Sequence, residues 1–184
     1  MAMDRKVVLI VDGYNVIRNN ARYASEDVDY ESQTTWNKAR ETLINDAAMM
    51  AKGTFERCTV VFDGAGNAKS KGKPTRVCGI DVIFSPAGVS ADTVIEKLAH
   101  DARESGREVV VVSSDFTIQS TVFGGGVTRM SSAGFAMAGE TLEEDWHETE
   151  HRAEMTVKNT VGSRIDPNVA AKLSAFVRGK GDLS

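Results

Sequence analysis

The apolar positions of this chain occur either in short unbroken runs or at spacings of three and four residues. The first run covers residues 7–11, which are all branched apolar residues, and it ends at Asp12-Gly13. An unbroken apolar run of this length is typical of a strand that is buried on both faces, as in the middle of a parallel sheet. The pattern therefore predicts a central strand with Asp12 at its carboxyl end.

Other segments also have the pattern of strands. Residues 58–62 form a mostly apolar run that ends at Asp63-Gly64, and residues 109–112 form one that ends at Ser113-Ser114-Asp115. Two of the predicted strands thus repeat the arrangement at Asp12, in which a buried strand leads into an aspartate. Further strands are predicted at 77–84 and, as a short edge strand after a glycine-rich turn, at 127–130.

Apolar residues at helical spacing lie between these strands. Trp36, Leu43 and Met50 share one face of a helix predicted over 33–52, and Ser90 is the expected N-cap of a helix that ends near residue 105. A polar loop is predicted at 18–31, and further helices at 115–123, at 135–158 and from Asp166 onward. Strands that alternate with helices in this way predict a single α/β domain with a mostly parallel sheet.

The composition is that of a globular protein with one sizeable core. The chain has 184 residues, of which 41% are hydrophobic and 26% are charged. The apolar run near the N-terminus is too short for a signal peptide or a membrane span, so we expect a cytoplasmic protein without a membrane partner. Cys58 and Cys78 lack a CxxC spacing and are expected to be reduced thiols. A net charge of −4 argues against a protein that coats nucleic acid by bulk electrostatic attraction.

Carboxylates follow three of the predicted strands. Asp12, Asp63 and Asp115 come at the strand ends, and Asp92 and Glu96 lie in the first turns of the helix that begins after Ser90. In open α/β sheets ligands bind beyond the carboxyl ends of the strands, where these side chains are expected to meet. So many carboxylates repel one another unless a cation neutralises them, and oxygen ligands suit Mg²⁺ or Mn²⁺. The alternative is a set of unrelated turns and helix caps.

The residue types in this group limit the chemistry that it can perform. It contains no histidine, cysteine or Ser-His pair, and therefore metal-assisted hydrolysis of a phosphodiester is the natural reaction. We expect one or two metal ions and no nucleotide cofactor. A protein that binds RNA or ribosomes but has lost catalysis is an alternative function of a different class.

Basic residues supply candidate contacts for a phosphate backbone. The loop at 67–76 has no acidic residue, is expected to be mobile and lies near the predicted carboxylate group. The alternative is that this loop is only solvated surface. The candidate RNA-binding residues are Lys69, Lys71, Lys73 and Arg76 in the loop, with Arg129, Arg178 and Lys180 as secondary candidates.

A different motif occurs in the charged helix predicted at 135–158. The string His147-Glu148-Thr149-Glu150-His151 matches HExxH, which in zinc peptidases places two imidazoles and a general base on one helix face. Acidic and basic residues surround the string, whereas a zinc-binding helix of this kind is normally packed in a cleft. We therefore interpret the match as a coincidence on a solvated helix and keep a zinc metallopeptidase as a weaker alternative.

Several short motifs together resemble the YacP-like NYN domain family, a branch of the PIN-like nucleases. They are Val11-Asp12-Gly13-Tyr14-Asn15, Val61-Phe62-Asp63, Ser90-Ala91-Asp92, Ser114-Asp115 and the closing Arg178-Gly179-Lys180-Gly181. The resemblance implies a PIN-like three-layer fold over residues 1–184, with a helical extension from about residue 135. It also implies a divalent-metal-dependent endoribonuclease, and for characterised bacterial members cleavage of messenger RNA on the ribosome.

The resemblance also implies roles for individual residues. Asp12, Asp92 and Asp115 match the acidic residues of the catalytic metal site. The matching supporting residues are Asn15, Asp63, Glu96 and Ser114. The chain departs from the expected pattern at Thr93, where relatives are expected to carry an acidic residue, and in its Gly- and Lys-rich segment 64–74.

Overall fold

The computed structural model describes residues 6–23, 33–64, 66–115 and 127–162. The chain forms two compact units, residues 1–142 and 143–184, and the long helix α5 (Ser132–Gly162) contributes residues to both. Within the described ranges no helix combines the length and the hydropathy that a membrane-spanning segment needs.

The first unit is built on a six-stranded sheet. Its strand order is β3-β4-β2-β1-β5-β6, and among these strands only β3 runs antiparallel to its neighbour. The bounds are Val7–Asp12 (β1), Arg57–Phe62 (β2), Thr75–Val77 (β3), Ile80–Phe84 (β4), Glu108–Val112 (β5) and Val127–Met130 (β6). This arrangement confirms the predicted α/β class and the central position of the first strand.

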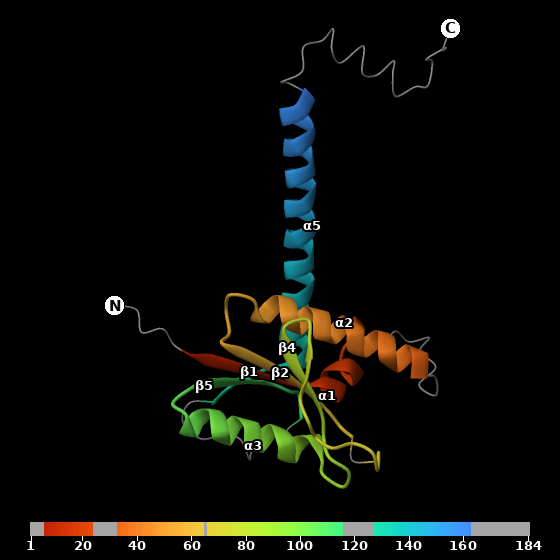
Figure 1. Cartoon of the computed structure of the whole chain (residues 1–184), viewed down its shortest axis with the longest axis vertical. Coiled ribbons are helices and arrows are strands. Elements are labelled where there is room, and N and C mark those ends of the chain that lie inside the picture. Colours follow the sequence, from red (N-terminus) through yellow and green to blue (C-terminus); the bar gives the residue numbers. More distant parts are fainter. Residues whose placement is uncertain (1–5, 24–32, 65, 116–126, 163–184) are drawn as a thin grey trace, which may run out of the picture. The chain divides into compact units, whose positions relative to one another are not determined.

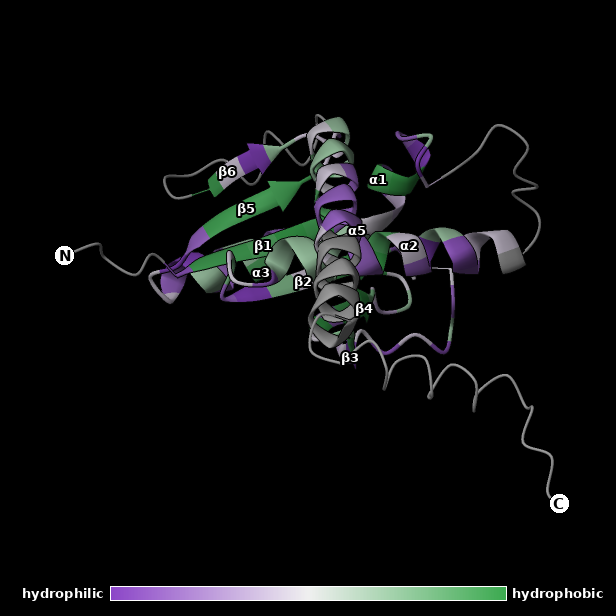
Figure 2. Cartoon of the chain, turned by 90° about the horizontal axis from the view of Figure 1, so that it is seen from above, coloured by the Kyte–Doolittle hydropathy of each residue, from purple (hydrophilic) through white to green (hydrophobic). Residues whose placement is uncertain are grey.

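Helices cover both faces of the sheet (Figure 1). One face packs against α1 (Gly13–Arg18), α2 (Gln33–Ala51) and the first turns of α5, where Phe135 is fully buried. The other face packs against α3 (Ala91–Glu104), mainly through Ile95 and Ala99. Figure 2 shows that β1 and β5, which lie between these layers, are hydrophobic along most of their length, as expected for strands buried on both faces.

The register of the parallel strands determines what meets at their carboxyl ends. Asp12 pairs with Val61 of β2, and Val11 pairs with Val112 of β5. The residues that follow these three strands therefore emerge at one edge of the sheet. This edge is the one at which the sequence predicted a site.

The strand predicted over 77–84 is confirmed for residues 80–84 only, because a hairpin turn separates β4 from β3. β3 and β4 are joined at Cys78 and Gly79, which both have a positive φ, of 49° and 83°. Glycine adopts this conformation without steric cost, which makes the tight turn possible. The turn was not predicted because the apolar residues Val77 and Ile80 flank it directly in the sequence.

The helices differ from the predictions mainly in their bounds. The helix α1 was not predicted, since six residues are too few to show helical periodicity. The predicted helix over 135–158 is longer at both ends, and the α2 and α3 predictions are confirmed to within two residues. The predicted helices at 115–123 and from Asp166 lie outside the described residues.

A buried ion pair holds the layer of α1, α2 and α5 together. Asp46 of α2 accepts hydrogen bonds from Arg22 (2.7 and 2.9 Å) and from the Tyr23 hydroxyl (2.8 Å). Gly139 of α5 lies directly against this carboxylate, where a Cβ atom would be 2.8 Å from Asp46 Oδ2. These contacts join α5 to the segment that follows α1, and α1 and α5 both supply residues to the site described next.

Candidate active site

Asp12 lies at the centre of the carboxyl edge of the sheet. It is the N-cap of α1, and its Oδ1 accepts a hydrogen bond from the Asn15 backbone N–H (3.3 Å). Its Oδ2 accepts one from Ser113 Oγ (3.3 Å). A side chain at Gly13 would collide with the Phe62 ring, so the turn from β1 into α1 requires glycine. The carboxylate is consequently held in one orientation with only 7% of Asp12 exposed.

The environment of Asp12 disfavours its ionised form. Burial raises the pKa of this carboxyl from 3.8 to about 6, and the negative charges of Asp92 and Asp115 add to the increase. The hydrogen bonds from Asn15 and Ser113 act in the opposite direction. A carboxyl group with a pKa near 6 is typical of sites that bind cations or transfer protons.

The other acidic candidates lie within electrostatic range of Asp12 or of Asp92. Asp92, in the first turn of α3, is half-buried, and burial raises its pKa. The charges of Asp115, Glu96 and Asp63 raise it further, in that order. The structure thus brings the acidic residues that the sequence singled out to one edge of the sheet.

A second group of polar side chains fixes the geometry of this edge. The Asn15 side-chain oxygen accepts hydrogen bonds from the Ser114 backbone N–H (2.8 Å) and from Ser132 Oγ (3.0 Å). Ser114 Oγ in turn contacts Ser132 Oγ at 2.9 Å and accepts a bond from its N–H (3.1 Å). This network joins α1, the end of β5 and the start of α5. Asn15 and Ser114 therefore act mainly by positioning the backbone around the carboxylates.

Three serines of the site were missed by the sequence analysis. Ser113 bridges two acidic residues, since its Oγ donates to Asp12 and accepts the Asp115 N–H (3.1 Å). Ser132 completes the Asn15 network, and the buried Ser85 binds Gly64 N (2.8 Å) and reaches Asp63 (3.5 Å). The position of Ser113 next to a strand-end aspartate was the one available signal.

Thr93 has a structural role where an acidic residue was expected. Its N–H donates to the N-cap Ser90 Oγ (3.3 Å), and the two hydroxyl groups lie 3.0 Å apart. This confirms Ser90 as the N-cap of α3. The start of the helix is thereby fixed next to Asp92.

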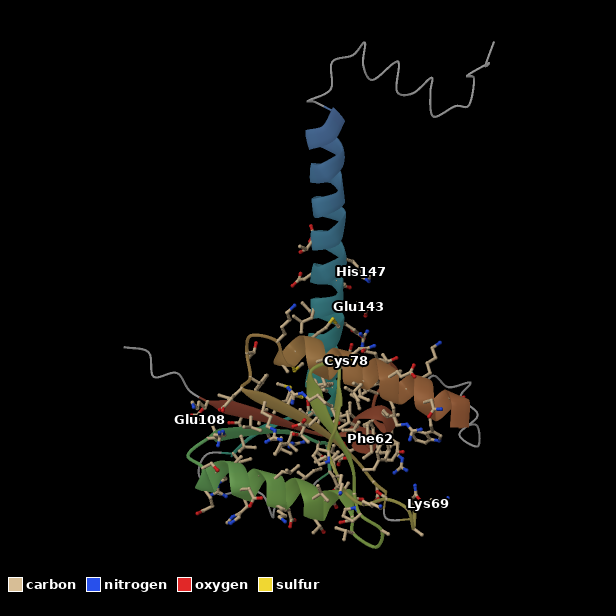
Figure 3. All side chains as sticks on the ribbon, viewed as in Figure 1. Phe62, Lys69, Cys78, Glu108, Glu143 and His147 are labelled. Atoms are coloured by element: carbon tan, nitrogen blue, oxygen red, sulfur yellow. The ribbon has the colours of Figure 1, made fainter. Side chains whose placement is uncertain are left out.

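The basic candidates among the described residues fall into three places, and the first is the lysine-rich loop. Lys69, Lys71 and Lys73 are exposed on the segment between β2 and β3. In Figure 3, Lys69 lies far from Glu108, which marks the amino-terminal end of β5. The loop that was expected to be mobile is anchored, because Ser70 Oγ donates to Ser85 O (2.6 Å) and Ala87 N donates to Ser70 O (3.2 Å).

Of the arginine candidates, one lies at the candidate active site and one pairs with a carboxylate elsewhere. Arg129 of β6 lies at the site, with its Nε 3.4 Å from Ser113 O. Arg76 of β3 instead pairs with Asp81 (3.0 Å), at the amino-terminal part of β4. Arg57 shares that buried carboxylate and helps to hold its pKa below the usual range, against the effect of burial. Arg178 and Lys180 lie outside the described residues.

The HExxH string lies on α5, as the sequence predicted, in the unit of residues 143–184. His147 and Glu148 are exposed. The side chains of Glu150 and His151 lie outside what the structure describes.

The donor atoms at the carboxyl edge suit a hard divalent cation. Asp12, Asp92 and Asp115 offer only oxygen, which Mg²⁺ and Mn²⁺ prefer. Burial, followed by repulsion between the carboxylates, raises the pKa values of Asp12 and Asp92, and a bound cation would relieve this repulsion. Within the described ranges no three acidic, histidine or cysteine side chains form a ready-made ligand group. The oxygen donors of these residues fit a hard divalent cation, which would have to draw the carboxylates closer together.

The sheet order, the helical layers on both faces and the acidic carboxyl edge together define a PIN-like nuclease fold. The chain belongs to the YacP-like NYN domain family, whose sequence profile matches residues 9–178. This confirms the resemblance inferred from the short motifs.

Individual relatives support the assignment. The chain is 35% identical to the protein YacP of Bacillus subtilis (strain 168) over 136 residues, which are 74% of this chain and 76% of that protein. A crystal structure of Rae1 (YacP) from Bacillus subtilis is similar with a TM-score of 0.63 and 29% identity, covering 98% of this chain and 100% of that one. A mutant of Rae1 gives a TM-score of 0.59 and 28% identity, with 91% and 98% covered.

Proposed function

We propose that this protein is a divalent-metal-dependent endoribonuclease that hydrolyses phosphodiester bonds of RNA. The observation that carries the proposal is the carboxyl edge, where burial and neighbouring charges raise the pKa values of Asp12 and Asp92. Such an arrangement is costly for folding unless it serves a cation or a proton transfer. The nuclease fold of the family makes phosphodiester hydrolysis the reaction that fits.

Asp12, Asp92 and Asp115 would hold one or two ions of Mg²⁺ or Mn²⁺. When bound, such an ion supplies an activated water and stabilises the oxygen that leaves. Asp63 and Glu96 add negative charge around Asp92 and strengthen the attraction for a cation. No nucleotide cofactor is needed for this reaction.

The remaining residues hold the site in place. Ser113 and the Asn15 N–H fix both oxygens of Asp12, so this carboxylate needs little rearrangement to bind a cation. The Asn15 side chain keeps Ser114, and with it the backbone that leads to Asp115, against α5. Arg129 places a positive charge beside Ser113, where it can attract a phosphate.

The test is incubation of the purified protein with a single-stranded RNA, with and without Mn²⁺, beside an Asp12→Asn variant. We expect cleavage only by the wild type and only with the metal. RNA that stays intact under every metal condition but still binds would favour the alternative, a catalytically inactive module that binds RNA or ribosomes.

The family resemblance extends the proposal to messenger RNA on the ribosome. An acidic protein attracts free RNA weakly, so a ribosome that presents the substrate would compensate for the missing bulk attraction. Cosedimentation with ribosomes in a salt series tests this extension.

Neutralising the basic loop should weaken RNA binding and flatten its dependence on salt. Each phosphate contact contributes about 0.7 to the slope of log K against log salt for a single strand. Replacing the three exposed lysines Lys69, Lys71 and Lys73 by Gln should therefore reduce the magnitude of this slope by about 2. Binding is measured across a potassium chloride series, with Ca²⁺ to suppress cleavage.

The matched control for this series is Arg76→Gln. Arg76 carries the same charge but is bound to Asp81, so its removal should leave the slope unchanged. If the triple variant had the wild-type slope, the loop would be solvated surface only.

Removing both histidines of the HExxH string should leave RNA cleavage and its metal dependence intact. The string belongs to the unit of residues 143–184, whereas all the described carboxylates of the site belong to residues 1–142. We would assay His147→Ala/His151→Ala for cleavage and measure the zinc content of both proteins. Stoichiometric zinc in the wild type that is lost in the double variant would support the metallopeptidase instead.

A further inference from the structure

Four aromatic rings form a continuous row beside the carboxyl edge. Neighbouring ring centroids are 5.2 Å apart for Trp36 and Tyr14, 5.1 Å for Tyr14 and Phe62, and 5.3 Å for Phe62 and Phe84. Phe62 comes immediately before Asp63, so the row adjoins the acidic group. At its far end Phe84 is 39% exposed, so part of its ring is open to solvent.

Two arginines lie over this row. The Arg18 guanidinium is 5.8 Å from the Tyr14 ring centroid and 5.9 Å from that of Trp36. Arg40 is 5.6 Å from the Phe84 centroid, and its NH1 donates to the Tyr14 hydroxyl (3.0 Å). In the part of the chain that the structure describes, neither arginine pairs with a carboxylate. No carboxylate of the described residues therefore offsets either charge.

Phe84 and Arg40 also border a hollow of 330 Å³ between α2 and the β3–β4 hairpin. Its walls combine apolar side chains with polar groups that can form hydrogen bonds. The residues that the inference uses are Asn37, Arg40, Glu41, Thr75, Val82 and Phe84. A flat apolar wall, a planar cation and polar groups at the rim are the features that bind an unpaired nucleobase.

We propose that this hollow binds an unpaired base of single-stranded RNA, stacked against Phe84 and Arg40. The inference rests on the proposed function, because RNA is the substrate that it positions. Stacking on aromatic and guanidinium planes needs no net positive charge, which explains how an acidic protein can hold RNA next to acidic residues. Because the row lies next to Asp63, a base bound in the hollow would direct the adjacent phosphodiester of the RNA toward the carboxylates of the candidate active site.

The test compares two replacements of Phe84 that both keep an apolar body. Phe84→Leu removes the ring, and Phe84→Tyr retains it. The probe is a single-stranded RNA that contains 2-aminopurine, whose fluorescence is quenched on stacking, titrated in Ca²⁺. We expect Phe84→Leu to bind about 5- to 150-fold more weakly, the range for loss of one base–aromatic stack, and to lose the quenching. Phe84→Tyr should bind within about twofold of the wild type.

Arg40 gives an independent readout. Arg40→Lys keeps the charge but not the plane, so it should weaken binding without changing the salt slope. Met137→Ala is the matched control, because Met137 is also a large exposed apolar residue but lies on α5. Thermal melting of every variant identifies any that fails to fold.

The outcomes separate this inference from the nuclease proposal. Wild-type affinity and quenching in both Phe84→Leu and Arg40→Lys would overturn the base-binding hollow even if RNA is cleaved. Loss of binding in these variants with no cleavage by the wild type would support the hollow and contradict the nuclease. A wild-type protein that binds no RNA would overturn both.

Discussion

Replacing Asp12 by Asn is expected to abolish RNA cleavage while the chain stays folded. Asparagine has nearly the same shape and is an equally good N-cap, so the turn into α1 is preserved. It lacks the charge that would hold a divalent cation. Loss of one group that stabilises transition-state charge typically lowers the rate on the order of 10²- to 10³-fold. We expect at least this loss for Asp12→Asn and for Asp115→Asn.

The assay follows cleavage of a labelled single-stranded RNA in Mn²⁺, with circular dichroism to confirm folding. The matched control is Asp101→Asn, because Asp101 is an exposed aspartate on α3, the helix that also carries Asp92. That variant should cut RNA at the wild-type rate. Cleavage that survives in both Asp12→Asn and Asp115→Asn would contradict the assignment of the site.

Without divalent metal, the free energy of unfolding is expected to fall as the pH rises from about 4 to about 6. The Asp12 carboxyl has a pKa of about 6 in the folded chain and of 3.8 as an ordinary aspartate. Between these values the unfolded chain has released the proton and the folded chain still binds it, so raising the pH favours unfolding. The full difference corresponds to about 3 kcal/mol above pH 6.

Urea unfolding at pH 4, 5, 6 and 7 in EDTA measures this effect. Asp12→Asn should lack this contribution and should be more stable than the wild type at pH 7, by up to about 3 kcal/mol. Because burial also affects other carboxyl groups, the difference between the two proteins at each pH is the quantity to compare.

Adding Mn²⁺ at pH 7 should make the wild type more stable than Asp12→Asn. A cation that binds the folded wild type stabilises it by mass action, whereas the variant has lost the central ligand. Equal pH profiles for the two proteins in EDTA would mean that Asp12 ionises normally. Equal stabilisation of both by Mn²⁺ would mean that the ion binds elsewhere.

Part of this protein could be predicted from the sequence, because the relevant interactions are local or follow from periodicity. Runs that are wholly or mostly apolar identified β1, β2 and β5, since strands that are buried on both faces carry no regular polar alternation. In a parallel sheet such strands end at the same edge, so Asp12, Asp63 and Asp115 were expected to meet. The Ser90 cap was likewise predicted from neighbours on the chain.

The rest depends on residues that are distant in sequence and approach one another only in the folded chain. Asn15 binds Ser114 and Ser132 from 99 and 117 positions away, and no local pattern marks such pairs. Arg76, which belongs to a basic stretch in the sequence, is bound to Asp81 because the hairpin brings the two side chains together. The pKa of Asp12 depends on burial, which is a property of the whole packed sheet edge. Sequence patterns were therefore sufficient to place Asp12, Asp63 and Asp115 at one edge of the sheet, because each lies at or just after the end of a strand. The hydrogen bonds that hold them, the raised pKa of Asp12 and the position of Arg129 depend on packing between distant segments.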